Sequence, residues 1–209
     1  MTRFLEYITN PEFEDALRAS SARHGHLCPR QVLGVRAAQA GTRHLGISVP
    51  RHDKKLLVIA EIDGCFLDGI DAVTGANIGH RTLRVEDYGK IAAVFVNAET
   101  GEAVRVAPRE NIREIALDHA PHESRSYFAM LVGYQIMPQE DLFNIVPVRL
   151  STPPDKLISR ARLKAVCAGC GEEIFNERQK ETAGEVLCAA CFGSSYYQEL
   201  LVEREFSGG

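Results

Sequence analysis

Val166-Cys167-Ala168-Gly169-Cys170-Gly171 and, farther along the chain, Cys188-Ala189-Ala190-Cys191 hold two Cys-x-x-Cys pairs separated by 17 residues. Tetrahedral zinc takes four thiolates, and a two-residue gap lets one tight turn point both sulfurs of a pair inward. The glycines of the first pair suit a knuckle turn that needs positive φ, and the second pair opens a segment of helical character. This pattern predicts a treble-clef zinc finger with Cys167, Cys170, Cys188 and Cys191 as its ligands.

The same four cysteines could instead form two redox dithiols or a pair of disulfides. Their paired spacing and the apparent lack of an export signal favour zinc. A closed four-sulfur site leaves no open coordination position, so this zinc is expected to stabilise a segment too small to build its own apolar core. We therefore expect a structural zinc within a carboxyl-terminal module, residues 163–209.

Composition narrows the class of protein. The chain has 209 residues, of which 45% are hydrophobic and 25% charged, enough for one full domain and a small module. Its net charge of −4 argues against nucleic-acid binding, despite a local basic run at residues 156–164. No stretch approaches about 18 apolar residues, and the amino terminus lacks a basic start followed by an apolar run. We expect a cytoplasmic protein with reduced cysteines that does not span a membrane.

The sequence pattern of residues 1–150 predicts an α+β core domain. Apolar periodicity with Gly and Pro signals places helices at residues 10–21, 29–40, 69–74, 108–119 and 123–137, and strands at 56–62, 82–86, 90–97, 103–107 and 144–148. Gly41 is expected to stop the second helix, and the turn at residues 99–102 to connect a hairpin. The result is a small mixed or antiparallel sheet with helices packed against it.

A linker is expected at residues 151–162, because Ser151-Thr152-Pro153-Pro154-Asp155 does not easily continue a strand or a helix. The tail, residues 195–206, predicts a helix that packs on the finger or docks a protein partner. Its exposed apolar residues would be Tyr196, Tyr197, Leu200 and Leu201.

A second group of reactive residues lies between the first two predicted helices, in His24-Gly25-His26-Leu27-Cys28-Pro29. Residues two apart in an extended segment face one side, so His24, His26 and Cys28 can point at one centre. Pro29 at the first helical position places Cys28 at the helix cap, where the helix dipole favours a thiolate. Such a thiolate is a nucleophile or a metal ligand; the alternative is a packed cysteine beside two surface histidines.

Cys65 follows the first predicted strand in Asp63-Gly64-Cys65-Phe66-Leu67-Asp68, where backbone amides and carboxylates tend to line a pocket. We interpret this as a loop site. The candidate catalytic residues are Cys28, Cys65, Asp63 and Asp68. The turn-rich segment that follows is either a polar cofactor pocket containing Thr74, Gly75 and His80 or a plain connecting loop.

Together these motifs resemble the family of the formylmethanofuran dehydrogenase E subunit (FmdE) over about residues 12–150. The resemblance is carried by the segment from His24 to Pro29, Val32-Leu33-Gly34-Val35-Arg36-Ala37-Ala38, Asp63-Gly64-Cys65 with Asp68, Thr74-Gly75 and Asp87-Tyr88-Gly89-Lys90. It implies an α+β homodimer with the histidines and cysteines clustered in a metal or active site. Family members often carry a carboxyl-terminal treble-clef finger. FmdE is associated with a complex that handles one-carbon formyl groups on methanofuran and uses a molybdopterin cofactor.

The chain departs from the family pattern at two places. The family usually has glycine after the Cys-Pro pair, where this chain has Arg30, and its glycine-lysine-glycine loop appears here as Ala76-Asn77-Ile78-Gly79-His80-Arg81-Thr82. If Arg30 and Arg81 face the pocket, they favour an anionic ligand; the alternative is a surface role for both.

Three functions fit these observations, and whether the protein is an enzyme stays open among them. In the first, His24, His26, Cys28 and Cys65 hold a second transition metal that binds water or a carbonyl-type ligand, in one-carbon or molybdopterin-related metabolism. In the second, the protein is a non-catalytic assembly component whose finger and tail dock a partner. In the third, Cys28 is a metal-free nucleophile with His24 or His26 as its base, but no oxyanion donor can be named.

Overall fold

The computed structural model describes residues 10–158 and 163–198, and it divides the chain into two compact units between Ile158 and Ser159. The division falls within residues 151–162, where a linker was expected. Part of that segment is nevertheless a short helix, α7 (Pro154–Leu157). Pro154 occupies its first position, where the fixed φ of proline suits a helix and its missing N–H is not needed.

A five-stranded mixed sheet forms the first unit's centre, in the order β2-β1-β3-β4-β5. Its strands are β1 (Leu56–Ala60), β2 (Leu83–Val85), β3 (Ala93–Asn97), β4 (Ala103–Pro108) and β5 (Phe143–Val148). The β1–β2 pair is parallel and the other three pairs are antiparallel. The predicted hairpin of β3 and β4 is confirmed.

Strands β2 and β3 are consecutive in the sequence but are not neighbours in the sheet, where they flank β1 on opposite sides. The connection between them crosses the end of β1, where the backbone N–H groups of Tyr88 and Lys90 donate to the carbonyl of Glu61. The sheet is mixed rather than purely antiparallel because α3 (Cys65–Thr74) connects β1 to β2, which lets these two strands run parallel.

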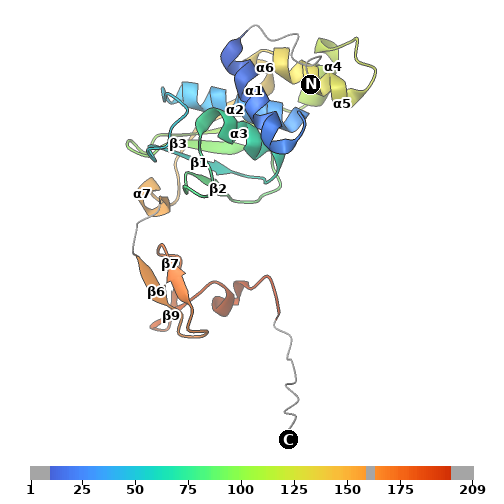
Figure 1. Cartoon of the computed structure of the whole chain (residues 1–209). Helices are drawn as coiled ribbons and strands as arrows, with labels where there is room; N and C mark the ends of the chain where they lie inside the picture. Colours follow the sequence, from blue (N-terminus) through green and yellow to red (C-terminus); the bar gives the residue numbers. More distant parts are fainter. Residues whose placement is uncertain (1–9, 159–162, 199–209) are drawn as a thin grey trace, which may run out of the picture. The chain divides into compact units, whose positions relative to one another are not determined.

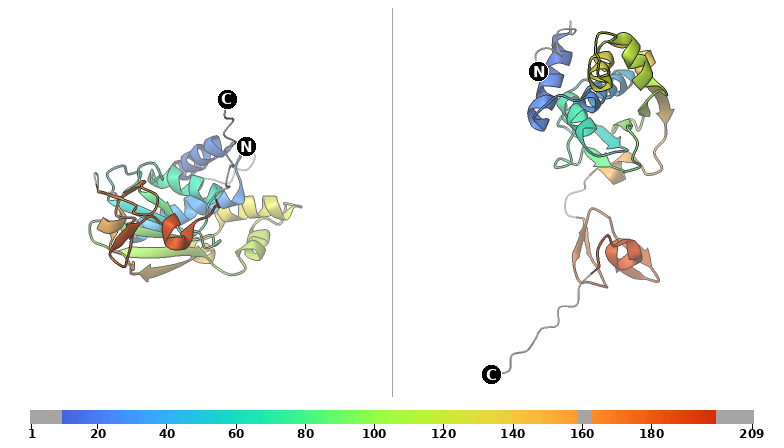
Figure 2. Two further views of the ribbon diagram at one scale, coloured as in Figure 1. Left: turned by 90° about the horizontal axis from the view of Figure 1, so that it is seen from below. Right: turned by 90° about the vertical axis from the view of Figure 1, so that its right-hand side faces the viewer.

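Helices α1 to α3 cover one face of this sheet (Figures 1 and 2). The helices of the first unit before α7 are α1 (Pro11–His24), α2 (Pro29–His44), α3 (Cys65–Thr74), α4 (Ile112–His119), α5 (Ser126–Ile136) and α6 (Gln139–Leu142). Helix α1 runs past its predicted end to Gly25, which adopts the left-handed conformation (φ 82°). Gly41 does not end α2: a Cβ there would lie 2.2 Å from the Phe95 ring, so this glycine makes room for the core.

The main hydrophobic core lies between helices α1 to α3 and the sheet, and it includes the fully buried Leu17, Phe66 and Phe95. On the other face of the sheet, Leu57 and Val96 pack with Leu157 of α7. No helix in residues 10–158 or 163–198 is long and apolar enough to cross a membrane.

Two glycines let α2 and α3 cross in backbone contact. A Cβ on Gly34 would lie 2.2 Å from the carbonyl oxygen of Phe66, and a Cβ on Gly69 would lie 2.3 Å from that of Gln31. Any side chain at either position would hold the helices apart. The crossing therefore brings the first turns of the two helices together, which is where Cys28 and Cys65 lie.

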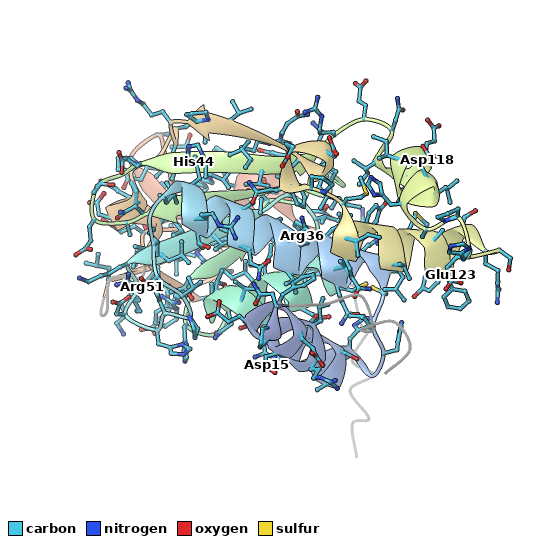
Figure 3. The ribbon with its side chains drawn as sticks, turned by 90° about the horizontal axis from the view of Figure 1, so that it is seen from above. Asp15, Arg36, His44, Arg51, Asp118 and Glu123 are labelled. Atoms are coloured by element: carbon cyan, nitrogen blue, oxygen red, sulfur yellow. The ribbon has the colours of Figure 1, made fainter. Side chains whose placement is uncertain are left out.

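Arg36 fastens α5 to α2 (Figure 3). Its guanidinium donates to the carbonyls of Tyr134, Gln135 and Met137 at the carboxyl end of α5, at 3.1, 2.9 and 2.7 Å. These carbonyls have no partner within the helix, and the cation also complements the negative end of the helix dipole.

The second unit contains two small antiparallel hairpins. They pair β6 (Lys164–Val166) with β7 (Glu173–Phe175), and β8 (Lys180–Thr182) with β9 (Glu185–Leu187), and a helical turn follows at η2 (Ala190–Ser194). Among its described residues, only Cys167 and Ile174 are buried hydrophobic groups, so the unit lacks an apolar core of ordinary size. The predicted tail helix is not present at residues 195–198, and Leu200 and Leu201 lie outside the described residues.

Candidate functional site

The four cysteines of the second unit form a metal-ligand cluster. The sulfur atoms of Cys167, Cys170, Cys188 and Cys191 all lie within 4.8 Å of one another. Four sulfurs at about 2.3 Å from a tetrahedral zinc stand about 3.8 Å apart, and Cys170 and Cys188 Sγ are separated by 3.9 Å. In residues 10–158 and 163–198, no other set of three or more His, Cys, Asp or Glu side chains comes together in this way.

The two glycines of the first cysteine pair contribute to this cluster in different ways, one through its backbone conformation and the other through its lack of a side chain. Gly171 has the positive φ expected of a knuckle (77°), but Gly169 does not. A Cβ on Gly169 would lie 3.0 Å from Cys191 Sγ, so that glycine keeps room for the sulfur.

The cysteines of this cluster differ in acidity. The backbone N–H of Cys188 donates to Cys167 Sγ at 3.2 Å. This contact and those of neighbouring amides lower the pKa of Cys167 to about 6, whereas the other three thiols raise the pKa of Cys191 to about 12. A bound dication would displace the remaining protons, so the donor set fits zinc.

In the first unit, Cys28 and Cys65 are neighbours although they lie far apart in the sequence. Cys28 is the buried N-cap of α2 and Cys65 is the half-buried first residue of α3. Burial raises the pKa of Cys28 to about 11; backbone N–H groups of Gln31 and Arg30 oppose this effect, and the Cys65 thiol adds to it. The metal-free Cys28 therefore keeps its proton at neutral pH, and the positive ends of two helices face the thiol pair.

His24 lies beside Cys65 on the wall of a cavity that Cys28 does not line, and it is held by a carboxylate. Its Nδ1 is 3.0 Å from Asp68 Oδ2, and Arg23 pairs with Asp71 one turn farther along α3. His24, Cys65 and Asp68 line a cavity of about 350 Å³ together with Asp71 and other residues. A histidine oriented through Nδ1 leaves Nε2 available for a metal or a proton.

The other predicted site residues are placed differently. His26 is exposed, with its ring 4.9 Å from that of His24. Asp63 is exposed and forms no ion pair within the described ranges. Neither residue lines the 350 Å³ cavity, and His24, His26, Cys28 and Cys65 do not supply three donor atoms within 4.8 Å of one another.

Thr74, Gly75 and His80, which were predicted to form a cofactor pocket, do not line the 350 Å³ cavity. Thr74 and Gly75 instead form the carboxyl-terminal end of α3. Thr74 is buried and its hydroxyl donates to the Ile70 carbonyl at 2.7 Å, while Gly75 ends α3 with φ 70°. The backbone N–H of His80 donates to the Asn77 side chain at 2.9 Å. Of this loop, Asn77 and Ile78 line the cavity instead. Cys65 and Asp68 belong to a helix and not to the loop expected from their glycine-rich surroundings.

The sequence analysis did not identify one residue that lies near the thiols. Tyr127 lies on the first turn of α5, and burial together with the charges of Cys28 and Cys65 raises its pKa. No local motif marks it, because it reaches the thiols only through the packing of α5 against α2.

Comparison with known protein families shows which family this chain belongs to. A family profile described as "FmdE, Molybdenum formylmethanofuran dehydrogenase operon" matches residues 23–144, more than half of the chain. The chain belongs to the FmdE family. A second profile, described as the prokaryotic dksA/traR C4-type zinc finger, matches residues 160–197. The FmdE match contains both core cysteines, and the finger match contains all four clustered ones. The resemblance inferred from the motifs is thus confirmed.

Two further proteins are similar to this FmdE-family chain. A protein of Archaeoglobus fulgidus named "Probable S-adenosyl-L-methionine-binding protein" is 27% identical over 195 residues, covering 83% of this chain and 51% of the relative. The chain thus spans about half the length of that relative. A crystal structure of a tungsten formylmethanofuran dehydrogenase FmdE-like protein from Syntrophus aciditrophicus superposes with a TM-score of 0.55. It is 21% identical, with coverage of 89% of this chain and 95% of that one, and it supports the fold.

Proposed function

We propose that this protein is a metal-binding member of the FmdE family in which Cys28 and Cys65, with His24, bind a transition metal that acts on a small carbonyl-type ligand such as a formyl group. The observation that carries the proposal is the meeting of two thiols at the first turns of α2 and α3, beside an imidazole on the wall of a 350 Å³ cavity. Soft sulfur and borderline nitrogen donors are those that zinc and similar metals prefer.

The residues have separate roles in this site. Cys28 and Cys65 supply thiolates once a cation displaces their protons, and the helix N-termini stabilise that charge. Asp68 holds the His24 ring so that Nε2 is free. A metal bound there supplies Lewis acidity, which polarises a carbonyl or lowers the pKa of bound water. The donor atoms of His24, Cys28 and Cys65 do not all lie within 4.8 Å of one another, so metal binding requires a rearrangement of these side chains.

Metal quantification tests this function in the full-length protein. After reconstitution with cobalt(II) or zinc and removal of loosely bound ions, we expect about two equivalents per chain. Cys28→Ser with Cys65→Ser should lose the core equivalent and keep the finger's. The matched change, Cys167→Ser with Cys170→Ser, should do the reverse. A wild-type protein that holds a single equivalent, all of it lost in the finger variant, would contradict the proposal.

A second candidate is a non-catalytic assembly component that docks a protein through its finger. It is favoured by the large exposed apolar side chains of that unit, including Val166, Phe175, Phe192 and Tyr196. The test is capture of a defined partner by the full-length chain and by a Phe175→Ser, Tyr196→Ser variant that retains its zinc. Equal capture by both proteins would count against this function.

A further inference from the structure

A second cavity, of about 560 Å³, lies in the first unit and shares no lining residue with the cavity beside the thiols. Its inner wall is apolar and buried, with Leu33, Ala92, Ile112 and Tyr134 each less than 7% exposed. Cavities of this size accommodate cofactor-sized ligands.

The outer wall of this cavity is strongly cationic. Five basic side chains line it, namely Arg30, Lys90, Arg105, Arg109 and Arg113, against a single lining carboxylate, Glu114. They come from α2, the β2–β3 connection, β4 with the residue after it, and α4, so no run of basic sequence accounts for the cluster. Its charge is opposite to the net charge of −4 carried by the whole chain.

Among the five cations, only Arg105 is neutralised by a carboxylate in the described part of the chain. Arg105 forms a two-bond ion pair with Glu61, at 2.6 and 2.7 Å, and Arg109 donates to the neutral backbone carbonyl of Glu140. Arg30, Lys90 and Arg113 form no ion pair with any residue in the described part of the chain. Like charges around one hollow repel each other, and an anion that enters it relieves that repulsion.

The backbone adds to the positive potential. Helix α2 begins at Pro29 and α4 begins at Ile112, and both of these first-turn residues line the cavity. The N-terminus of a helix carries a partial positive charge and free N–H groups, which favour phosphate. The N–H groups of Arg30 and Gln31 already donate to the Cys28 sulfur, so α2 contributes only its dipole to this cavity, and the amino-terminal end of α4 supplies the N–H groups.

We propose that this cavity binds a nucleotide, with its phosphates against Arg30, Lys90 and Arg113 and its base on the apolar wall formed by Ile112 and Tyr134. A ligand that matches both walls of the cavity needs an anionic group for the cationic wall and a flat apolar group for the apolar wall. Neither Cys28 nor Cys65 lines this cavity, although Pro29 and Arg30 directly follow Cys28 in the chain.

Isothermal titration calorimetry of the zinc-loaded full-length protein tests this site with ATP, pyrophosphate, adenosine and S-adenosylmethionine as probes. ATP should bind most tightly, since pyrophosphate lacks the base, adenosine lacks the charge and S-adenosylmethionine carries a sulfonium and no phosphate. Arg30→Gln with Arg113→Gln should weaken ATP binding by about tenfold or more. The matched control Arg149→Gln, an exposed arginine outside the cavity lining, should leave it unchanged.

Arg30 and Arg113 are exposed, so the double variant should keep the wild-type unfolding midpoint, and Lys90→Gln provides an independent arm of the test. The proposal is overturned if ATP shows no binding at millimolar concentration, or if Arg149→Gln weakens ATP as much as the double variant. It is also overturned if adenosine or S-adenosylmethionine binds as tightly as ATP.

Discussion

Gly34 and Gly69 face each other where α2 crosses α3: a Cβ built on Gly34 would lie 3.1 Å from the Cα of Gly69. This contact between two backbones sets the separation of the helices, and with it the distance between the thiols at their first turns. The core site therefore depends on two residues that have no reactive group of their own.

Gly34→Ala should destabilise the first unit by about 1–3 kcal/mol, because the new methyl group meets the rigid Phe66 carbonyl. Urea unfolding followed by circular dichroism measures this loss. In the control, Gly79→Ala, the nearest atom to the Cβ is 3.4 Å away, so its effect should stay within about 0.5 kcal/mol. Equal stability of the two variants would show that the helices can separate without cost.

Arg36→Met should lower the free energy of unfolding by about 2–4 kcal/mol, since three carbonyls at the end of α5 lose their donor. Burial, helped by nearby Arg43, lowers the pKa of Arg36 to about 10, so the side chain is still charged at neutral pH. Arg43→Met is the matched control on the same helix, because Arg43 is exposed and makes one contact of 3.3 Å with Gln139. Denaturant midpoints that fall equally in both variants would argue against this role.

Removal of zinc by a chelator should unfold the finger, because Cys167 and Ile174 are its only buried hydrophobic residues in the described range. Hydrogen exchange measured by mass spectrometry should show loss of amide protection in β6 to β9. The β3–β4 hairpin, which has a buried apolar face, is the internal reference in the same sample. Persistent protection of the finger amides after metal loss would contradict a structural role for zinc.

Gly169→Ala should weaken zinc binding by about tenfold, because its methyl group would lie 3.0 Å from Cys191 Sγ and shift that ligand. Competition with a chromogenic chelator measures the affinity. Ala189→Ser, an exposed change within the second cysteine pair, is the control and should bind zinc like the wild type.

Asp68→Asn should weaken cobalt(II) binding at the core thiols by about tenfold, since His24 loses the carboxylate that orients it. The thiolate-to-cobalt absorption band reports occupancy, and the finger is kept filled with zinc. Asp63→Asn removes a carboxylate from an exposed position near the same helix and should have no effect. If both variants bind cobalt like the wild type, Asp68 has no positioning role.

Local patterns were enough for the features that depend on neighbouring residues. The spacing of Cys167, Cys170, Cys188 and Cys191 predicted a cluster that the structure contains. The hairpin of β3 and β4 followed from one turn. Predicted helix ends were wrong where tertiary packing outweighed a local signal. Gly41 was expected to end α2, but the helix continues through it, and the Phe95 ring occupies the place that a side chain at position 41 would take.

The core site could be predicted only in part. Cys28 at the cap of α2 followed from Pro29, but Cys65 was expected in a loop and lies on a helix. Tyr127 had no local signal, because its position depends on α5 packing against α2.

The sequence by itself determined the four-cysteine cluster and the α+β class, because these depend on spacing and periodicity within short segments, and its motifs carried the resemblance to the family. Only the tertiary structure decided that Cys28 meets Cys65, and that Arg30, Lys90 and Arg113 surround one cavity. Such contacts join residues dozens of positions apart, and they are set by helix crossings and strand order, which a local pattern does not encode.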